Sequence, residues 1–199
     1  GIGAIAVLRM SGTGCIALTD RIFESPSGKK LTGSKANTVH FGRILEEGCL
    51  LDEVLVTIFH APHSFTGEES VEIACHGSLY IQQRLLQLLV NQGARMATPG
   101  EFTQRAFLNG KIDLSQAEAV ADLIASSSAA SHRMALKQMK GGFSAELMKL
   151  RGELLHITSL LELELDFSEE DVEFADRSEL RRIAGNIDEL LTRLCRSFS

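Results

Sequence analysis

The sequence has no tryptophan, one tyrosine and only three prolines among its 199 residues. It lacks any apolar run of the roughly 18 to 20 residues that a membrane span needs, and its first nine residues lack the features of a secretory signal. An excess of positive charge is also missing, because 20 Lys and Arg stand against 26 Asp and Glu, a net charge of -6. This balance excludes a basic nucleic-acid clamp, since phosphate contacts need clustered cations.

The four cysteines form neither a metal-binding nor a disulfide pattern. No C-x-x-C pair occurs, and only Cys75 has a histidine beside it, His76. Neighbours on a strand point to opposite faces, so these two could not readily share a metal. We therefore expect no metal site and reduced thiols, which are typical of a cytoplasmic protein.

The two halves of the chain differ in composition. Residues 1–114 carry 10 basic and 11 acidic side chains and all three prolines, whereas residues 115–199 carry 10 basic and 15 acidic side chains. The first half alternates short β-branched segments with turns, which predicts a mixed sheet-and-helix domain. Its expected strands are 2–10, 38–44, 51–59 and 70–75, and its clearest helix is 79–91. The fold class is therefore α+β, with a domain over 1–113 and an all-α helical-bundle segment over 114–199.

Helical periodicity dominates the second half. Ser115 and Glu118 predict a capping box at the start of its first helix, and the small residues 126–131 predict a helix break or a close helix contact. A leucine-rich seam with 3, 4 spacing is better explained as the core stripe of a bundle than as a coiled coil, because it lasts only about two heptads. The seam comprises Leu147, Leu150, Leu154, Ile157 and Leu161. The acidic residues that follow, between 162 and 176, lack the ligand order of a calcium loop and predict a solvated turn before a last helix over 178–195.

The common catalytic motifs are absent. The sequence contains no G-x-x-x-x-G-K-[ST], no G-x-S-x-G and no H-E-x-x-H, so neither a phosphate-binding loop nor acyl or zinc-hydrolase chemistry is indicated. We assign no catalytic residue.

A polar constellation remains on otherwise apolar elements. The strand period places Glu72 and His76 on one face of segment 70–76 and the apolar residues on the other. A carboxylate there needs donors, either an internal Arg or Lys or a ligand with two parallel N–H groups, such as a pterin edge. Arg9 ends the first apolar segment, and Lys111 follows a Pro-Gly entry, a short helix and an Asn-Gly turn that fix its position.

Four motifs in order make the chain resemble the MnmE (TrmE) family of tRNA-modification GTPases. They lie at residues 1–12, 64–77, 99–124 and 165–171 and span nearly the whole chain. The resemblance implies a tetrahydrofolate-binding and dimerisation domain similar to that of aminomethyltransferases, followed by the first helices of a helical domain. A GTPase domain that binds GTP, Mg²⁺ and K⁺ would lie beyond residue 199, so we expect the chain to be part of a longer polypeptide and inactive alone.

The resemblance also implies a site and partners. It assigns folate contacts to Arg9, Glu72 and Lys111, with Glu72 accepting the pterin N–H pair and the two cations at the other end of the ligand. The cofactor would be a 5-formyl or 5,10-methylene tetrahydrofolate that supplies a one-carbon unit. The family acts as a homodimer with the flavoprotein MnmG on C5 of the wobble uridine of tRNA.

Alternative functions stay open at this point. The chain could be a dimerisation and scaffold module without direct chemistry, or a folate-dependent aminomethyltransferase. We expect tRNA to bind this chain only weakly, because its cations are dispersed among more numerous acids. One departure from the family is Ser78, where His-Gly-Gly is usual, which puts any role of a second glycine in doubt.

Overall fold

The computed structural model describes residues 3–166 and 177–197. Contacts divide the chain into two compact units, Gly1–Ala121 and Asp122–Ser199. The division falls inside helix α4 (Leu114–Ala125), a few residues after the boundary expected from the sequence. Among the described residues, no helix has both the length and the apolar character that crossing a bilayer would need.

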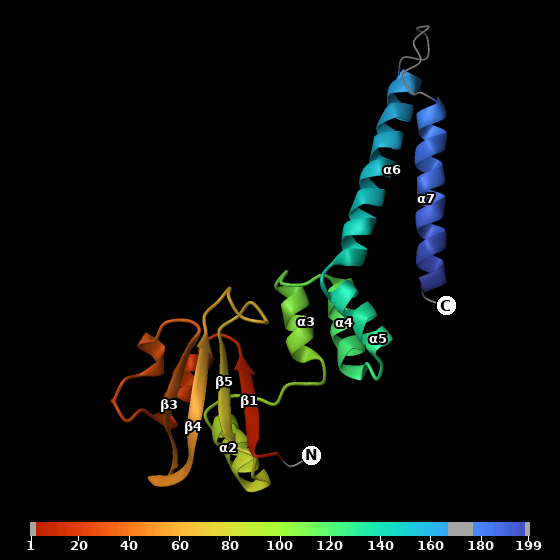
Figure 1. The fold of residues 1–199 in the computed structure, drawn as a ribbon. Helices are drawn as coiled ribbons and strands as arrows, with labels where there is room; N and C mark the ends of the chain where they lie inside the picture. The colour runs from red at the N-terminus through yellow and green to blue at the C-terminus, as the bar shows by residue number, and fades with distance from the viewer. Residues whose placement is uncertain (1–2, 167–176, 198–199) are drawn as a thin grey trace. The chain divides into compact units, whose positions relative to one another are not determined.

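The first unit is built on one antiparallel sheet of five strands with the order β1-β5-β4-β3-β2 (Figure 1). The four strands expected from the sequence are confirmed with small shifts at their ends, whereas the two-residue strand β2 was not predicted. The strands are β1 (Ile5–Ser11), β2 (Phe23–Glu24), β3 (Thr38–Glu46), β4 (Cys49–Phe59) and β5 (Ser70–His76). Strand β1 lies at one edge of the sheet and β5 is its neighbour, although 58 residues separate them in sequence.

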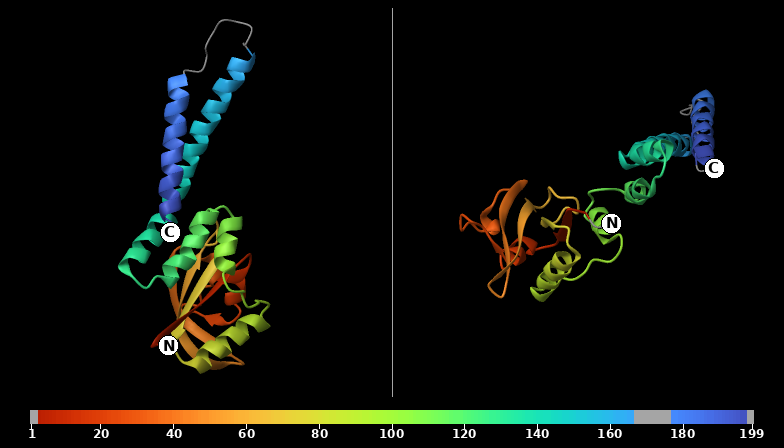
Figure 2. Two further views of the ribbon diagram at one scale, coloured as in Figure 1. Left: turned by 90° about the vertical axis from the view of Figure 1, so that its right-hand side faces the viewer. Right: turned by 60° about the horizontal axis from the view of Figure 1, so that its bottom comes forward.

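One face of this sheet carries the hydrophobic core. Alternate residues of the strands are buried, as the period of two requires, and they pack with helices α1 (Cys15–Thr19) and α2 (Leu79–Asn91). Leu85 and Leu89 supply the buried side of α2, and α2 lies to one side of the sheet in Figure 2. The short 3₁₀ helix η1 (Leu31–Gly33) adds Leu31 to the same core.

The opposite face of the sheet is exposed and largely apolar. In the strand register, Val7 lies opposite Ala74, Ala74 opposite Leu55, and Leu55 opposite Phe41. These four residues form a row across β1, β5, β4 and β3, in which Val7, Phe41 and Leu55 are exposed. We call it the apolar row. A second row, Arg9, Glu72, Thr57 and Val39, runs parallel to it on the same face.

Helix α3 (Glu101–Leu108) follows the sheet and confirms the short helix expected before Lys111. Helix α4 also forms as expected, but the capping box over Ser115 and Glu118 was predicted wrongly. The backbone N–H of Gln116 donates to Asp113 Oδ1 at 2.8 Å, and the N–H of Asp113 donates to Gln116 Oε1 at 2.9 Å. The first helical residue is Leu114, so this reciprocal pair shifts the cap two residues toward the N-terminus.

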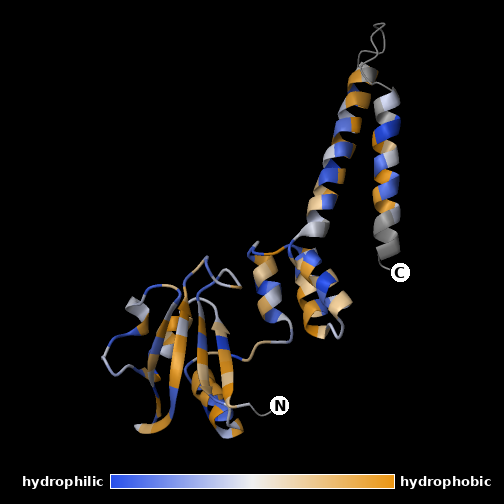
Figure 3. Ribbon diagram, in the orientation of Figure 1, coloured by the Kyte–Doolittle hydropathy of each residue, from blue (hydrophilic) through white to orange (hydrophobic). Residues whose placement is uncertain are grey.

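The second unit is helical, as predicted. The expected break at the small residues is confirmed, because α4 ends at Ala125 and Ser128 caps α5 (Ala129–Met139) with Ser131 at N3. Helices α6 (Gly142–Asp166) and α7 (Arg177–Ser197) follow, with apolar residues distributed along α6 (Figure 3). In the predicted seam, Leu150 is buried but Leu147, Leu154 and Leu161 are exposed. The end of the acidic turn, residues 167–176, lies outside the described residues.

Candidate functional site

Arg9 and Glu72 form an ion pair on the exposed face of the sheet. They are directly opposed partners in the β1–β5 register, and Arg9 Nε donates to Glu72 Oε1 at 2.7 Å. A terminal nitrogen of Arg9 donates to the same oxygen. The two side chains are 45% and 28% exposed. The Glu72 carboxylate therefore has the internal arginine partner that sequence analysis left as one of two alternatives, and the pair remains open to solvent.

Two aromatic rings flank this ion pair. The guanidinium carbon of Arg9 lies 6.0 Å from the ring centre of Phe65 and 5.9 Å from that of Phe102. Both separations are in the range of cation–π attraction. Phe65 belongs to the loop of residues 60–69 between β4 and β5, and Phe102 is the second residue of α3. Sequence analysis assigned neither ring to the site, because nothing in the local pattern links them to Arg9.

Lys111, the third predicted residue, follows α3 and contacts the loop of residues 60–69, but it does not take part in the ion pair. Its Nζ donates to the backbone oxygen of Pro62 at 3.0 Å. A side-chain carbon of Lys111 would lie only 3.0 Å from a Cβ added at Gly67, whose φ is +79°. Within the described part of the chain Lys111 has no carboxylate partner, so its charge is available to a ligand.

A polar network holds the loop of residues 60–69 against β1 and α3. Thr66 is 1% exposed, and its hydroxyl lies 2.6 Å from that of Ser11. Its backbone oxygen accepts from Asn109 Nδ2 at 2.8 Å. Glu68 accepts from Ser11 at 2.9 Å and from Arg105 at 3.1 Å. The loop is therefore fixed from both sides, which explains why the Ser-Phe-Thr-Gly-Glu-Glu motif carries so many small polar residues.

The same network continues to Glu101 at the start of α3. Its carboxylate accepts from both Arg95 and Arg105, and the backbone N–H of Thr98 donates to it at 2.9 Å. The hydrogen bonds from Arg95, together with the other donors, hold the pKa of Glu101 well below its ordinary value. Glu101 thus joins the segment after α2 to α3 and, through Arg105, to Glu68.

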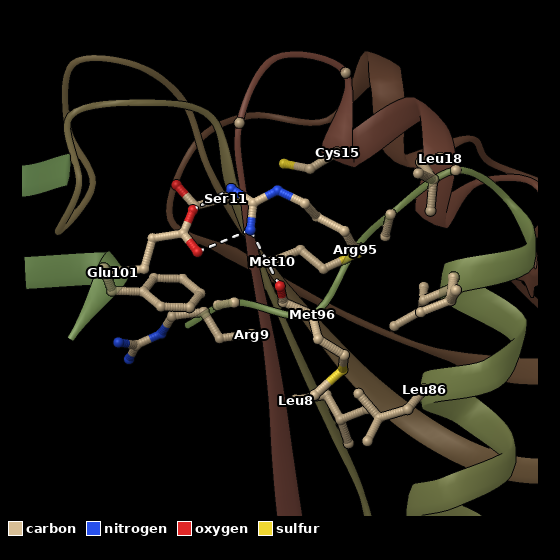
Figure 4. A pocket seen from close by; sticks show the side chains of 18 of the residues that line it. Leu8, Arg9, Met10, Ser11, Cys15, Leu18, Leu86, Arg95, Met96 and Glu101 are labelled. Atoms are coloured by element: carbon tan, nitrogen blue, oxygen red, sulfur yellow. Dashed lines mark hydrogen bonds and ion pairs between the residues drawn. The ribbon is translucent and has the colours of Figure 1, made fainter. Parts of the chain in front are cut away.

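A cavity of about 410 Å³ lies on the core side of β1 and shares Arg9 and Phe102 with the site. Its apolar wall includes Leu8 and Leu86, and Arg95 extends along it to reach Glu101 (Figure 4). Cys15 also lines the cavity. Burial, followed by repulsion from Glu69, raises the pKa of the Cys15 thiol to about 12, so this cysteine is not a nucleophile.

His76, at the end of β5, is hydrogen-bonded to Asp52, a contact that sequence analysis did not identify. Its Nδ1 lies 2.7 Å from Asp52 Oδ1, and its backbone N–H donates to Asp52 Oδ2 at 2.9 Å. At the next residue, a Cβ on Gly77 would lie 1.8 Å from the backbone oxygen of Gly3, so only glycine fits. Ser78 precedes the first residue of α2 and has φ -68° and ψ 130°, an extended conformation open to any residue. Serine in place of the family's second glycine therefore causes no backbone strain at position 78.

The chemistry available here is recognition rather than bond breaking. The site offers an accessible carboxylate paired with a guanidinium, two flanking rings and a separate ammonium group. Cys15, Cys49 and Cys75 are free thiols. Across the described residues, no group of three or more His, Cys, Asp or Glu side chains is placed to hold a metal ion.

Two family models match the chain and together account for nearly all of it. The model described as "GTP-binding protein TrmE N-terminus" matches residues 1–111. The model described as "MnmE helical domain" matches residues 114–199. The junction between the two matches lies next to Lys111 and just before α4.

Curated relatives agree with these matches. Proteins named "tRNA modification GTPase MnmE" are 64% identical over 198 residues in Bacteroides fragilis, 59% over 202 residues in Parabacteroides distasonis and 57% over 199 residues in Flavobacterium johnsoniae. The matches cover 99 to 100% of this chain but only 43 to 44% of each relative, so the chain spans less than half their length. By these matches and by its α+β sheet followed by helices, the chain belongs to the MnmE family of tRNA modification GTPases, whose N-terminal part it represents.

Proposed function

We propose that this chain is the folate-binding and dimerising part of an enzyme that modifies C5 of the tRNA wobble uridine in the cytoplasm. The ligand would be a tetrahydrofolate in its 5-formyl or 5,10-methylene form, which supplies the one-carbon unit when bound. The Arg9–Glu72 pair on the open face of the sheet carries this proposal. GTP, Mg²⁺ and K⁺ would be bound outside these 199 residues, and the flavoprotein MnmG would act with the dimer on tRNA.

The residues present fit the amino-pyrimidinone edge of a pterin. Both Arg9 hydrogen bonds go to Glu72 Oε1, and among the described residues no donor contacts Oε2. A ligand N–H can therefore donate to Oε2 while Arg9 stays in place and keeps the carboxylate oriented. Because Arg9 touches Glu72, both would meet the same end of the ligand, which differs from the arrangement expected from the sequence. Lys111 is then left to attract a carboxylate or carbonyl elsewhere on the molecule.

Titration of a reduced folate by calorimetry tests this proposal. We expect Glu72→Gln to weaken binding by about 2–5 kcal/mol, the usual cost of removing one partner of a hydrogen-bonded charge pair. Glu53→Gln is the matched control, because Glu53 also pairs with an arginine, Arg43, across neighbouring strands on the same sheet face. Equal binding by wild type and Glu72→Gln would remove Glu72 from the site.

The other outcomes separate the alternative functions. Absence of folate binding by the wild-type protein would favour a scaffold without direct chemistry. Transfer of an aminomethyl group by the chain without the flavoprotein would favour an aminomethyltransferase instead. Tight binding of tRNA by residues 1–199 at physiological salt would contradict the assignment of tRNA to the larger complex.

The apolar row supports the dimerisation part of the proposal. A sheet face with exposed Val7, Leu55 and Phe41 in one row is typical of a surface that another protein covers. We expect Leu55→Glu to convert a dimer to monomers in sedimentation experiments. Leu50→Glu is the control, because Leu50 is also exposed but lies near the β3–β4 turn and outside the row. A dimer that survives Leu55→Glu would place the interface elsewhere.

A further inference from the structure

Phe65 is an exposed aromatic ring on a firmly held loop. The residue is 43% exposed, although its neighbours on both sides are fixed. Ser64 Oγ donates to the backbone oxygen of Glu68 at 2.6 Å, and Thr66 is buried in the network with Ser11. The loop therefore holds the Phe65 ring at a defined position before any ligand binds. Binding then costs less conformational entropy, because the loop is already ordered.

The Phe65 ring lies near the Arg9 end of the ion pair that contains Glu72. Arg9 connects the two, because its guanidinium is bonded to Glu72 Oε1 and lies 6.0 Å from the Phe65 ring centre. This guanidinium is a flat, N–H-donating group that packs near aromatic rings while it donates to Glu72. The N–C(=N)–N unit of a 2-amino-pyrimidinone has the same donors and the same flat shape. The contacts of Arg9 thus show that Glu72 and the nearby rings can bind a flat group that donates N–H hydrogen bonds.

Resting on the folate function proposed above, we propose that Phe65 is a further ligand-binding residue. Its ring stacks against the flat heterocycle whose N–H edge donates to Glu72 Oε2, while Arg9 stays bonded to Oε1 and its guanidinium lies 5.9 Å from the ring centre of Phe102. Stacking selects flat ligands and hydrogen bonding orients their edge, so specificity for a pterin needs both residues. Phe102 is not assigned the same role, because this residue of α3 is partly buried and also lines the cavity on the core side of β1.

Three substitutions at this position separate stacking from apolar contact. Loss of one aromatic stacking partner weakens ligand binding roughly tenfold or more, so we expect that loss for Phe65→Ala in calorimetric titration of a tetrahydrofolate to the full-length protein. Phe65→Leu keeps apolar volume but no π face and should weaken binding nearly as much. Phe65→Tyr keeps the π face and should bind like wild type.

Tyr80→Ala is the matched control. Tyr80 is an aromatic residue that is 64% exposed on α2, outside the site and outside the apolar row. Tyr80→Ala should leave folate affinity within about twofold of wild type, and thermal unfolding should confirm that each variant is folded. A second probe, pterin without its glutamate tail, should show the same loss with Phe65→Ala, since the missing contact is to the ring.

The titrations distinguish failure of the Phe65 assignment from failure of the proposed folate function. Tight folate binding by wild type and equally tight binding by Phe65→Ala would overturn the Phe65 assignment and leave the folate function standing. Weakened binding by Phe65→Ala but wild-type binding by Phe65→Leu would also overturn it, because apolar contact alone would then suffice. If wild type binds no reduced folate, the proposed function fails and this assignment fails with it.

Discussion

Glu101 and Arg105 lie one turn apart on α3, and Arg105 Nε donates to Glu101 Oε1 at 3.0 Å. Arg105 also donates to Glu68, and Arg95 donates to Glu101 from the segment before the helix. The two carboxylates and two guanidinium groups therefore alternate along one network. This network joins α3 to the loop that carries Phe65 and borders Lys111, so its integrity affects the candidate site.

The network predicts sensitivity to acid. Hydrogen bonds from Arg95 hold the pKa of Glu101 below its ordinary value of 4.5, whereas in the unfolded chain the carboxyl returns to that value. The stability that Glu101 contributes is therefore fully present above about pH 4.5 and is lost as the pH falls toward the lower folded-state pKa. Urea unfolding measured between pH 6 and pH 3 should show a steeper loss for wild type than for Glu101→Gln.

Glu24→Gln provides the control for this measurement. Glu24 is exposed on β2, and the described residues include no ion-pair partner for it. Its substitution should leave the pH dependence of unfolding unchanged. Identical pH profiles for wild type and Glu101→Gln would show that the network does not contribute to acid sensitivity.

Alanine substitutions at two glycines can test whether folate binding depends on the position of Lys111. Gly67 and Gly28 both have positive φ, +79° and +68°, so alanine at either position should cost about 1–2 kcal/mol of stability. A Cβ at Gly67 would crowd Lys111, whereas a Cβ at Gly28 would meet nothing within 4 Å. We expect Gly67→Ala but not Gly28→Ala to weaken folate binding in the same titration. Equal binding by both variants would indicate that Lys111 does not need its contact with Pro62.

The cysteines should differ sharply in reactivity. Cys49 is exposed, whereas Cys15 and Cys75 are buried, and burial raises the pKa of both buried thiols, that of Cys15 to about 12. Since the thiolate is the reactive form, a Cys195→Ser variant at pH 8 should show one fast and two slow thiols with a disulfide reagent. Adding Cys49→Ser should remove the fast phase. A fast phase that persists in that variant would mean that the core opens readily.

The Asp52–His76 contact should contribute to stability mainly through Asp52. Asp52 is 8% exposed and accepts both from the His76 backbone and from its ring. Asp52→Ala removes the acceptor of a backbone N–H and should lower the free energy of unfolding by about 1–3 kcal/mol. His76→Ala keeps the backbone contact and should cost less, because the His76 side chain is 69% exposed. Larger loss from His76→Ala in urea unfolding would reverse this interpretation.

Local patterns in the sequence were sufficient for much of the fold. The period of two in segment 70–76 correctly placed Val71, Ile73 and Cys75 on the buried face, and the leucines of α2 predicted its core side. The cap of α4 was missed because Asp113 and Ser115 are both good N-cap residues, and the choice between them depends on where the first helical turn begins. Asp52 was missed as the partner of His76 because 24 residues separate them.

The sequence by itself determined the four longer strands, most of the helices and the candidate site residues, because these follow from short-range periodicity, turn chemistry and motifs that resemble a known family. Only the tertiary structure decided that Arg9 and Glu72 form one ion pair and that Phe65 and Phe102 lie near its guanidinium. It also decided that Lys111 contacts the loop of residues 60–69 and stays outside the pair. Strand pairing brings together residues 63 positions apart. No local preference encodes that register, since it depends on burying one whole face of the sheet beneath α1 and α2.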